Sequence, residues 1–306
     1  MTREEIIKKF QNLNLWKSKG QRAVHKPLLV LYAIGKLLSG ENRLISYADA
    51  EDDLRNLLKE FGPLKPTHRP QYPFWRLRNE KDRIWEIPDA HRIQEYIRTD
   101  GTSTGDARIE DLRRYGVGGF PEPIAYQLRQ QPQIAFEVVQ NLLNSHFPFS
   151  YHSDILQTVG IVLPLLQLQS RIPDFRENVL RAYNYSCAVC GFDVKLRNQP
   201  VALEASHIKW HQAGGPDTEV NGLALCSLHH KLFDRGVFTL SAKLKVLVSE
   251  YAYGSVGFDE WLMKFHDKEI NFPQRQAYHP HEDFIDWHLR EVFKWPEREK
   301  NLTSKA

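Results

Sequence analysis

The residues best suited to chemistry lie in one stretch in the second half of the sequence. Cys187-Ala-Val-Cys190 and Cys226-Ser-Leu-His229 each place two metal-ligating side chains around a two-residue gap, and residues 191–225 separate the two pairs. Two such turns can complete a tetrahedron around Zn²⁺. Cysteines can also serve only as apolar filling, but all three cysteines of the chain fall in this pattern. The spacing therefore predicts a structural zinc site with four ligands: Cys187, Cys190, Cys226 and His229.

Three further polar residues accompany the cysteine pairs in a fixed order. His207 stands in the strand-like segment EASHIKW, Asn221 opens the segment NGLALC, and His230 opens the segment HKLFDRG. Over residues 187–240 this arrangement resembles the HNH, or ββα-metal, nucleases. The resemblance implies a fold of two antiparallel strands and a helix. It also implies metal-assisted hydrolysis of phosphodiester bonds, which needs a base to activate water and a cation to neutralise developing charge.

The same resemblance implies a role for each residue of the motif. His207 would be the general base at the end of the first strand, and imidazole suits that role because its ordinary pKa is near ~6.5. Asn221 would hold the turn and orient that histidine. His230 would be a ligand of a catalytic divalent ion, and Asp234, one helical turn later, can point at the same ion.

One position departs from the pattern of the HNH family. Many relatives carry Asp or His immediately before the base histidine, as a metal ligand, whereas this chain has Ser206. The catalytic ion would then be held by His230, Asp234, waters and the scissile phosphate, an arrangement that suits Mg²⁺ or Mn²⁺. Lys209, two residues after the base, is equally well explained as a phosphate contact or as an ordinary surface lysine.

The first half of the chain carries basic and aromatic residues in short clusters. They are HKPLL, shortly after Arg22, then HRPQYPFWRL, and NLLNSHFP near the end of this half. Over roughly residues 5–160, these segments and their order resemble the sulfur-binding domain of restriction endonucleases that cleave phosphorothioate-modified DNA. Such proteins join this domain to a C-terminal HNH module, so the resemblance implies the same two-part organisation here.

A sulfur-binding domain must distinguish sulfur from a non-bridging phosphate oxygen. Sulfur is larger and poorly hydrated, so a shallow apolar cup accepts it, whereas an oxygen there would lose hydrogen bonds from water. Tyr72 and Pro73, exposed by a turn, are the expected cup, and Phe74 and Trp75 are expected to be a buried plug. The expected contacts to phosphates and base edges are Arg22, His25, Lys26, Arg69 and Arg76. For His25, DNA contact and internal packing are equally favoured.

Hydrophobic periodicity predicts the elements that carry these residues. Helices are expected at residues 6–15, 27–38, 49–61, 132–147, 175–185, 258–265 and 284–293. Short strands are expected at residues 74–77, 83–87, 203–208, 237–240 and 244–247. Two glycine-containing segments, residues 101–105 and 116–123, are expected to be flexible loops, and Gly118, Gly119 and Phe120 are candidates to enter a DNA groove. Helices with a few short antiparallel strands indicate the α+β class in both halves.

Composition and length fit a two-domain globular protein. The chain has 306 residues, 42% hydrophobic and 26% charged. We expect a mostly helical DNA-recognition domain with a few short strands over residues 1–160, and an HNH domain over 161–306 with its core at 175–250. The net charge of +3 restricts any nucleic-acid surface to a local patch. Few cysteines, no signal-peptide core, and an apolar stretch (155–168) shorter than the ~20 residues of a membrane span predict a cytoplasmic protein.

These observations predict a modification-dependent restriction endonuclease that binds phosphorothioated double-stranded DNA and hydrolyses phosphodiester bonds nearby. One alternative keeps the nuclease and lets the first half read another modified base or a plain sequence. A second alternative, suggested by Ser206, is a catalytically weak DNA-binding regulator. Because one HNH module cuts one strand, a double-strand break would need two copies, which makes a homodimer on DNA a candidate assembly.

Overall fold

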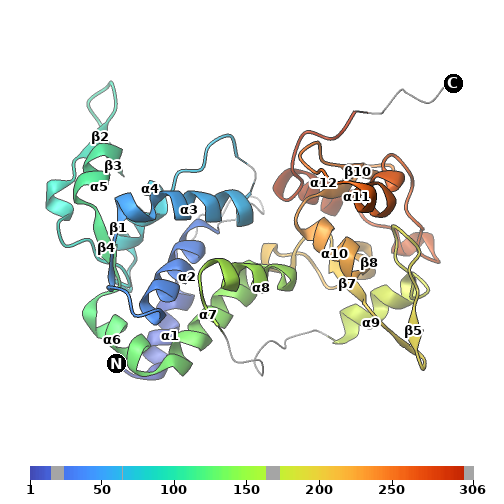
Figure 1. The fold of residues 1–306 in the computed structure, drawn as a ribbon, viewed down its shortest axis with the longest axis horizontal. Helices are drawn as coiled ribbons and strands as arrows, with labels where there is room; N and C mark the ends of the chain where they lie inside the picture. The colour runs from blue at the N-terminus through green and yellow to red at the C-terminus, as the bar shows by residue number, and fades with distance from the viewer. Residues whose placement is uncertain (15–23, 64, 163–172, 300–306) are drawn as a thin grey trace. The chain divides into compact units, whose positions relative to one another are not determined.

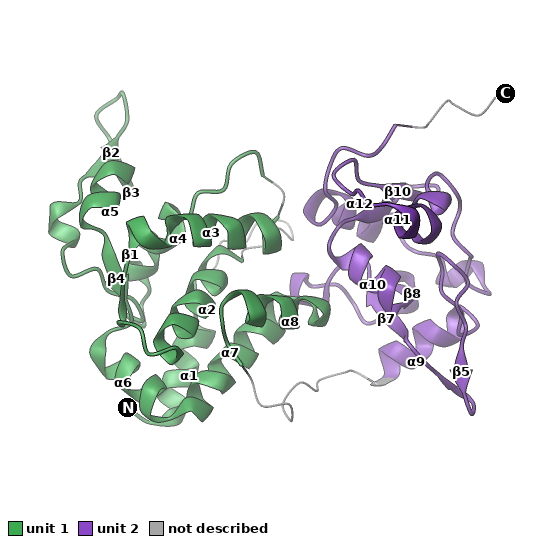
Figure 2. Cartoon of the chain, in the orientation of Figure 1, with its two compact units in different colours: residues 1–167 green, residues 168–306 purple. Residues whose placement is uncertain are grey.

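The computed structural model describes residues 1–14, 24–63, 65–162 and 173–299. The chain divides into two compact units, residues 1–167 and 168–306 (Figure 2). Both units combine helices with short two-stranded antiparallel sheets. This confirms the α+β class expected from the sequence. Within the described ranges, no helix has the length and apolar character needed to cross a membrane.

Unit 1 is mostly helical (Figure 1). Its helices are α1 (Arg3–Gln11), α2 (His25–Leu38), α3 (Tyr47–Phe61), α4 (Gln71–Arg76), α5 (Ile109–Tyr115), α6 (Glu122–Gln130), α7 (Pro132–His146) and α8 (Phe149–Thr158). Its strands are β1 (Leu44–Ser46), β2 (Glu95–Ile97), β3 (Ser103–Ala107) and β4 (Val117–Gly119). Strand β1 pairs with β4, and β2 pairs with β3, both antiparallel.

Helix α2 is the centre of unit 1. Its sequence, HKPLLVLYAIGKLL, is apolar almost throughout, and its residues from Pro27 to Gly35 are buried. Pro27 lies in the first turn, where a missing N–H costs no helical hydrogen bond. The helix contacts α3, α4, α6 and α7. A helix that is hydrophobic on every side needs neighbours on every side, and these four helices supply them.

The segment around Trp75 is a helix, so the strand expected at residues 74–77 is wrong. Helix α4 continues into a 3-10 turn at Leu77–Asn79, and Phe74, Trp75 and Leu77 are buried. Short apolar runs fit a strand or one face of a short helix equally well, and packing decides between them. Residues 83–87 form no strand either, apart from one isolated bridge between Glu86 and Gly119. The expected plug of Phe74 and Trp75 is present as a buried pair.

The glycine-rich segments of unit 1 are structured. Residues 117–119 form β4, and a Cβ on Gly119 would lie 1.8 Å from the carbonyl oxygen of Arg43, so glycine permits this close pairing. Phe120 is fully buried and packs edge-on against Phe10 and Trp85. The expectation that Gly118, Gly119 and Phe120 enter a DNA groove is therefore wrong. Residues 103–105, expected to be loop, belong to β3.

Unit 2 contains a hairpin followed at once by a helix (Figure 1). Its helices are α9 (Pro173–Ala182), α10 (Ser227–Asp234), α11 (Val256–Trp261) and α12 (Glu282–Glu291). Its strands are β5 (Lys195–Leu196), β6 (Gln199–Pro200), β7 (Leu203–His207), β8 (Gly222–Cys226), β9 (Phe238–Leu240) and β10 (Val246–Val248). The order β7, β8, α10 is the ββα arrangement implied by the HNH resemblance.

The register of the hairpin places the motif residues at its two ends. Leu203 pairs with Cys226, and His207 pairs with Gly222. Strand β8 is buried along its whole length, with α9 and α10 both in contact with the hairpin. A Cβ on Gly222 would lie 2.3 Å from Cγ2 of Val179. Glycine at this position therefore lets α9 pack directly across the end of the hairpin that carries His207.

Candidate functional site

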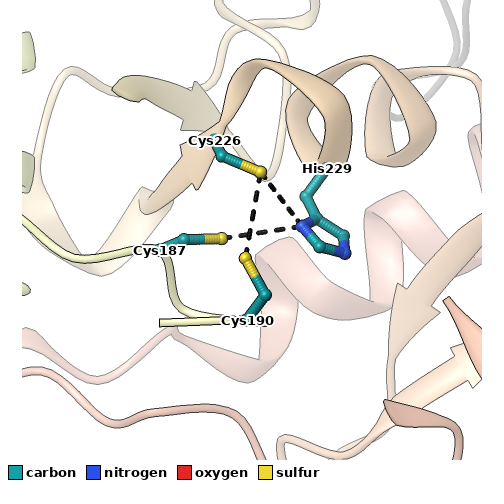
Figure 3. Close-up of side chains that lie close together, drawn as sticks. All are labelled: Cys187, Cys190, Cys226 and His229. Atoms are coloured by element: carbon teal, nitrogen blue, oxygen red, sulfur yellow. Dashed lines mark hydrogen bonds between the residues drawn. The ribbon is translucent and has the colours of Figure 1, made fainter. Parts of the chain in front are cut away.

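Four side chains from three segments converge on one point in unit 2 (Figure 3). Cys187 and Cys190 lie on the loop after α9, Cys226 ends β8, and His229 lies in the first turn of α10. The His229 Nδ1 atom lies 3.8 Å from Cys187 Sγ and 3.1 Å from Cys226 Sγ. The Sγ atoms of Cys190 and Cys226 lie 3.9 Å apart. The cysteines are free thiols rather than disulfides.

The four ligand atoms fit a tetrahedral zinc ion. All of them lie within 4.8 Å of one another. A Zn²⁺ ion with bonds of about 2.0–2.3 Å holds its ligands roughly 3.3–3.8 Å apart, so only a small movement of the side chains would bring all four to the ion. The Nε2 atom of His229 lies 2.8 Å from the carbonyl oxygen of Trp261, to which it donates when protonated. That hydrogen bond leaves Nδ1 unprotonated and facing the sulfurs, which is the usual way a metal-binding histidine is oriented.

His207 lies at the end of β7 with its ring fixed on two sides. The ring of Phe175, from α9, stacks on it at a centroid distance of 3.8 Å and an interplanar angle of 12°. Its Nε2 atom lies 2.7 Å from Oδ1 of Asp217. Within the described ranges, its Nδ1 atom has no hydrogen-bond partner. Burial lowers the pKa of His207, and the Asp217 carboxylate opposes that shift.

Asn221 closes the loop between the two strands. It is fully buried, and its Oδ1 atom accepts a hydrogen bond from the backbone N–H of Lys209 at 2.8 Å. Its Nδ2 atom donates to the carbonyl oxygens of Lys209 and Pro216, each at 2.9 Å. One amide thus ties both ends of residues 209–216 together, immediately beside His207 and Asp217.

His230, the residue after His229, lies between two carboxylates. Its Nδ1 atom is 2.6 Å from Oε2 of Glu204, and its Nε2 atom is 3.1 Å from Oδ2 of Asp234. The hydroxyl of Ser227 donates to the other oxygen of Glu204 at 2.9 Å. Burial disfavours the imidazolium, but Asp234 and Glu204 outweigh burial and raise the pKa of His230 to about 10.

Ser206 occupies the position where many HNH relatives have a metal ligand. It is fully buried, and its Oγ atom has no hydrogen-bond partner within the described residues. Alternate residues of a strand share a face, so Ser206 lies on the same face of β7 as Glu204. Glu204 contacts Ser227 and His230 of α10, so this face is directed towards that helix. A lone buried hydroxyl on this face is a polar atom that an ion or its water could satisfy.

In unit 1, Tyr72 lies beside two guanidinium groups. Arg69 donates to the Tyr72 hydroxyl at 2.8 Å, and its guanidinium carbon lies 5.7 Å from the ring centroid. The Arg76 guanidinium lies 4.6 Å from the same centroid and forms two hydrogen bonds with Asp106, at 2.6 and 2.7 Å. Pro73 is buried within α4, so the expectation that a turn exposes its ring is wrong; Tyr72 is half-buried.

The other cationic residues expected to contact DNA are less exposed than Arg69 and Arg76 or lie outside the described residues. Lys26 forms an ion pair with the buried Glu80 and also donates to the carbonyl oxygen of Asn14 at 2.8 Å. His25 is the first residue of α2 and is half-buried. Arg22 lies outside the described residues. Among these cations, Arg69 and Arg76 are thus the two exposed ones that the structure describes.

The sequence analysis missed the carboxylates that partner these residues. Glu204 and Asp217 contact the two motif histidines, while Glu80 and Asp106 pair with Lys26 and Arg76. Glu204 lies in the segment EASH, three residues before His207, so its position was visible although its partner was not. Asp217, Glu80 and Asp106 carry no spacing signal, because their partners lie on other elements.

Two family models match the chain. One, described as ScoMcrA-like, DNA sulfur-binding domain, matches residues 3–163, and the other, described as HNH endonuclease, matches residues 187–241. The first match covers more than half of the chain. The resemblances drawn from the sequence are confirmed by these two matches. No curated protein matches the chain.

Three solved structures that are similar to this chain share 21–22% sequence identity with it. The sulfur-binding domain of ScoMcrA complexed with phosphorothioated DNA is 21% identical, with a TM-score of 0.42 over 51% of this chain and 94% of that one. The equivalent SprMcrA complex is 22% identical, with a TM-score of 0.39 over 53% and 95%. The Type IV phosphorothioation-dependent restriction endonuclease ScoMcrA is 21% identical, with a TM-score of 0.42 over 50% of this chain and 32% of its own length.

Proposed function

This chain belongs to the family of ScoMcrA-like DNA sulfur-binding domains, and from that membership we propose that it is a restriction endonuclease for phosphorothioated DNA. In this proposal, unit 1 binds the modified duplex and unit 2 hydrolyses phosphodiester bonds. The observation that carries it is the presence in one chain of a sulfur-binding-domain match and an HNH endonuclease match. The grouping of His207, Asn221 and His230 around β7, β8 and α10 supports the nuclease part.

The sulfur would be recognised beside Tyr72. The half-buried ring of Tyr72 offers apolar surface. Contact with such a surface costs the poorly hydrated sulfur little, whereas a phosphate oxygen there would lose hydrogen bonds from water. Arg69 and Arg76 hold positive charge over the ring, so the neighbouring phosphates are attracted to the same place. Arg69 forms no ion pair within the described residues, which leaves its charge available to DNA.

His207 would be the general base. Its Nδ1 atom takes a proton from a water molecule, and the water oxygen attacks the phosphorus atom. The bond between phosphorus and the 3′ oxygen breaks, and the leaving oxygen takes a proton from solvent. The products carry a 5′ phosphate and a 3′ hydroxyl. Burial lowers the pKa of His207 and so favours the unprotonated form that a base needs.

His230 and Asp234 would hold the catalytic divalent ion. Nε2 of His230 lies 3.1 Å from Oδ2 of Asp234 and donates a proton to it. A bound Mg²⁺ or Mn²⁺ ion would displace that proton and take both atoms as ligands. When bound, such an ion would supply positive charge that neutralises the charge developing on the phosphate and the leaving oxygen. Glu204 accepts the Nδ1 proton of His230 and so orients its Nε2 atom, the usual partnership of carboxylate, histidine and metal. Ser206 would contact a water of the ion.

The zinc site would be structural. Its four protein ligands leave no open position, which distinguishes structural from catalytic zinc. It joins the loop after α9 to the end of β8 and the start of α10, so it fixes the helix that carries His230. Cys226 and His229 would belong to the zinc site, while His230 and Asp234 of α10 would hold the catalytic ion.

The experiment that tests the proposal compares matched duplexes. Purified protein is incubated with Mg²⁺ or Mn²⁺ and with duplexes of one sequence, unmodified or carrying either phosphorothioate diastereomer. Cleavage confined to a modified duplex is the expected result. Cleavage of all duplexes would show that unit 1 reads another feature, and binding without cleavage would show a regulator rather than a nuclease. On a modified plasmid, the ratio of nicked to linear product reports whether two copies act together.

A further inference from the structure

The loop between β7 and β8 carries a carboxylate that no motif explains. Asp217 lies next to Pro216, whose carbonyl oxygen is held by Asn221 at 2.9 Å. The Oδ1 atom of Asp217 lies 2.7 Å from Nε2 of His207, and its Oδ2 atom lies 3.9 Å from Nε2 of His211. The Asp217 side chain is 27% exposed, so solvent screens this pair only in part.

We propose that Asp217 is a positioning residue for His207, holding its proton on Nε2 so that Nδ1 is the basic nitrogen. The inference deepens the proposed function, because it names the group that selects the working tautomer of the general base. Asp217 accepts the Nε2–H hydrogen bond throughout the reaction. The proton removed from water therefore goes to Nδ1, and the carboxylate stabilises the imidazolium that results.

Every group facing His207 is consistent with this role. Phe175 stacks on the ring and offers no hydrogen bond, so it fixes the ring plane but not the tautomer. His211 and Asp234 influence His207 through charge only, His211 lowering its pKa and Asp234 raising it. Within the described ranges, Asp217 is the one hydrogen-bond partner of the ring. It alone can decide which nitrogen keeps the proton.

The arrangement also gives Asn221 a physical task. Its amide holds the carbonyl oxygens of Lys209 and Pro216 and accepts the N–H of Lys209. The residue after Pro216 is Asp217, so the asparagine fixes the backbone that delivers the carboxylate to His207. Asn221 then acts on the base through Asp217 rather than by direct contact with substrate.

The first measurement needs neither a variant nor activity. In full-length protein labelled with ¹⁵N-histidine and prepared with zinc only, the ring nitrogen shifts of His207 report its tautomer, and His207→Gln identifies its signals. We expect a protonated Nε2 and an unprotonated Nδ1 at pH 8. The opposite tautomer in the wild type would overturn the inference. This outcome is distinguishable from failure of the proposed function, which the cleavage assay reports.

The second measurement compares variants in cleavage. Asp217→Asn should lower kcat by roughly 100-fold with little change in KM. The acid limb of its pH profile should move to lower pH, because losing a carboxylate lowers the pKa of His207. Asp217→Glu should recover part of the rate. The matched control is Asp259→Asn, which removes an exposed carboxylate from α11 and should leave kcat unchanged.

Folding is checked by zinc content and thermal melting, which should match the wild type in all three variants. If Asp217→Asn cleaved at the wild-type rate with an unshifted pH profile, Asp217 would be only a loop residue and the inference would fail. If Asp217→Asn does not fold, the tautomer in the wild-type protein still decides.

Discussion

The two units use charged and ligating residues in opposite ways. In unit 2, side chains that the sequence marks by type and spacing converge on each other, as the four candidate zinc ligands do. In unit 1, two of the cations marked as DNA contacts are paired with carboxylates of the same domain, Lys26 with Glu80 and Arg76 with Asp106. A ligand pattern therefore predicts which side chains lie together better than a cluster of like charges does. Metal geometry restricts which spacings work, whereas a carboxylate anywhere in the fold can neutralise a lysine or arginine.

The largest expected effect breaks unit 2 and leaves unit 1 intact. Cys226→Ser should lose zinc and unfold or aggregate unit 2, because metal binding supplies much of the folding free energy of such sites. Zinc analysis and limited proteolysis check this, and binding to phosphorothioated DNA should persist through unit 1. Stoichiometric zinc in a well-folded Cys226→Ser protein would contradict the structural role. Loss of DNA binding would show that the two units do not act separately.

The next effect separates catalysis from binding. His207→Ala should reduce cleavage by about 10²–10⁴-fold while leaving affinity for modified DNA nearly unchanged, because a base acts in the transition state. Asn221→Ala and His230→Ala should also be severely impaired. Single-turnover cleavage and a binding titration with the same duplex give the two quantities. A His207→Ala enzyme with the wild-type rate would mean that another group is the base.

A smaller effect tests the sulfur cup in unit 1. Tyr72→Ala should weaken binding to phosphorothioated DNA by about ten- to a hundredfold, towards the affinity for unmodified DNA, because it removes about 1.5–3 kcal/mol of apolar contact. Tyr126→Ala on α6 is the matched control, since that tyrosine is 55% exposed. Equal losses with both duplexes would move the cup elsewhere in unit 1 and make Tyr72 a general contact.

The smallest expected effect compares Arg69, which has no ion pair within the described residues, with the ion-paired Arg76. Arg69→Ala should weaken binding to modified and unmodified duplexes alike and reduce the salt slope by about one per lost phosphate contact. Arg76→Ala should cost less, because Asp106 already neutralises that guanidinium. Asp106→Asn should instead raise affinity for both duplexes a few-fold. Salt titrations of the three variants measure this, and a larger loss for Arg76 than for Arg69 would show that the ion pair opens on DNA.

The sequence alone determined the parts of this protein that depend on local spacing. The cysteine pairs and the order His207, Asn221, His230 carried the resemblance to HNH nucleases, and that resemblance implied the hairpin and helix that the structure contains. Long apolar periods likewise marked α2, α3 and α7. Neither inference needs knowledge of what lies across the fold.

Tertiary structure alone decided the partners and the short elements. The segment 74–77 became a helix and residues 117–119 a strand, since burial against distant neighbours outweighs weak local preference. Asp217 contacts His207, and Asp106 contacts Arg76, because the folding of other elements places each carboxylate beside its partner. A hydrogen bond or ion pair between elements depends on the packing of the whole domain, so the spacing of residues along the chain does not predict it.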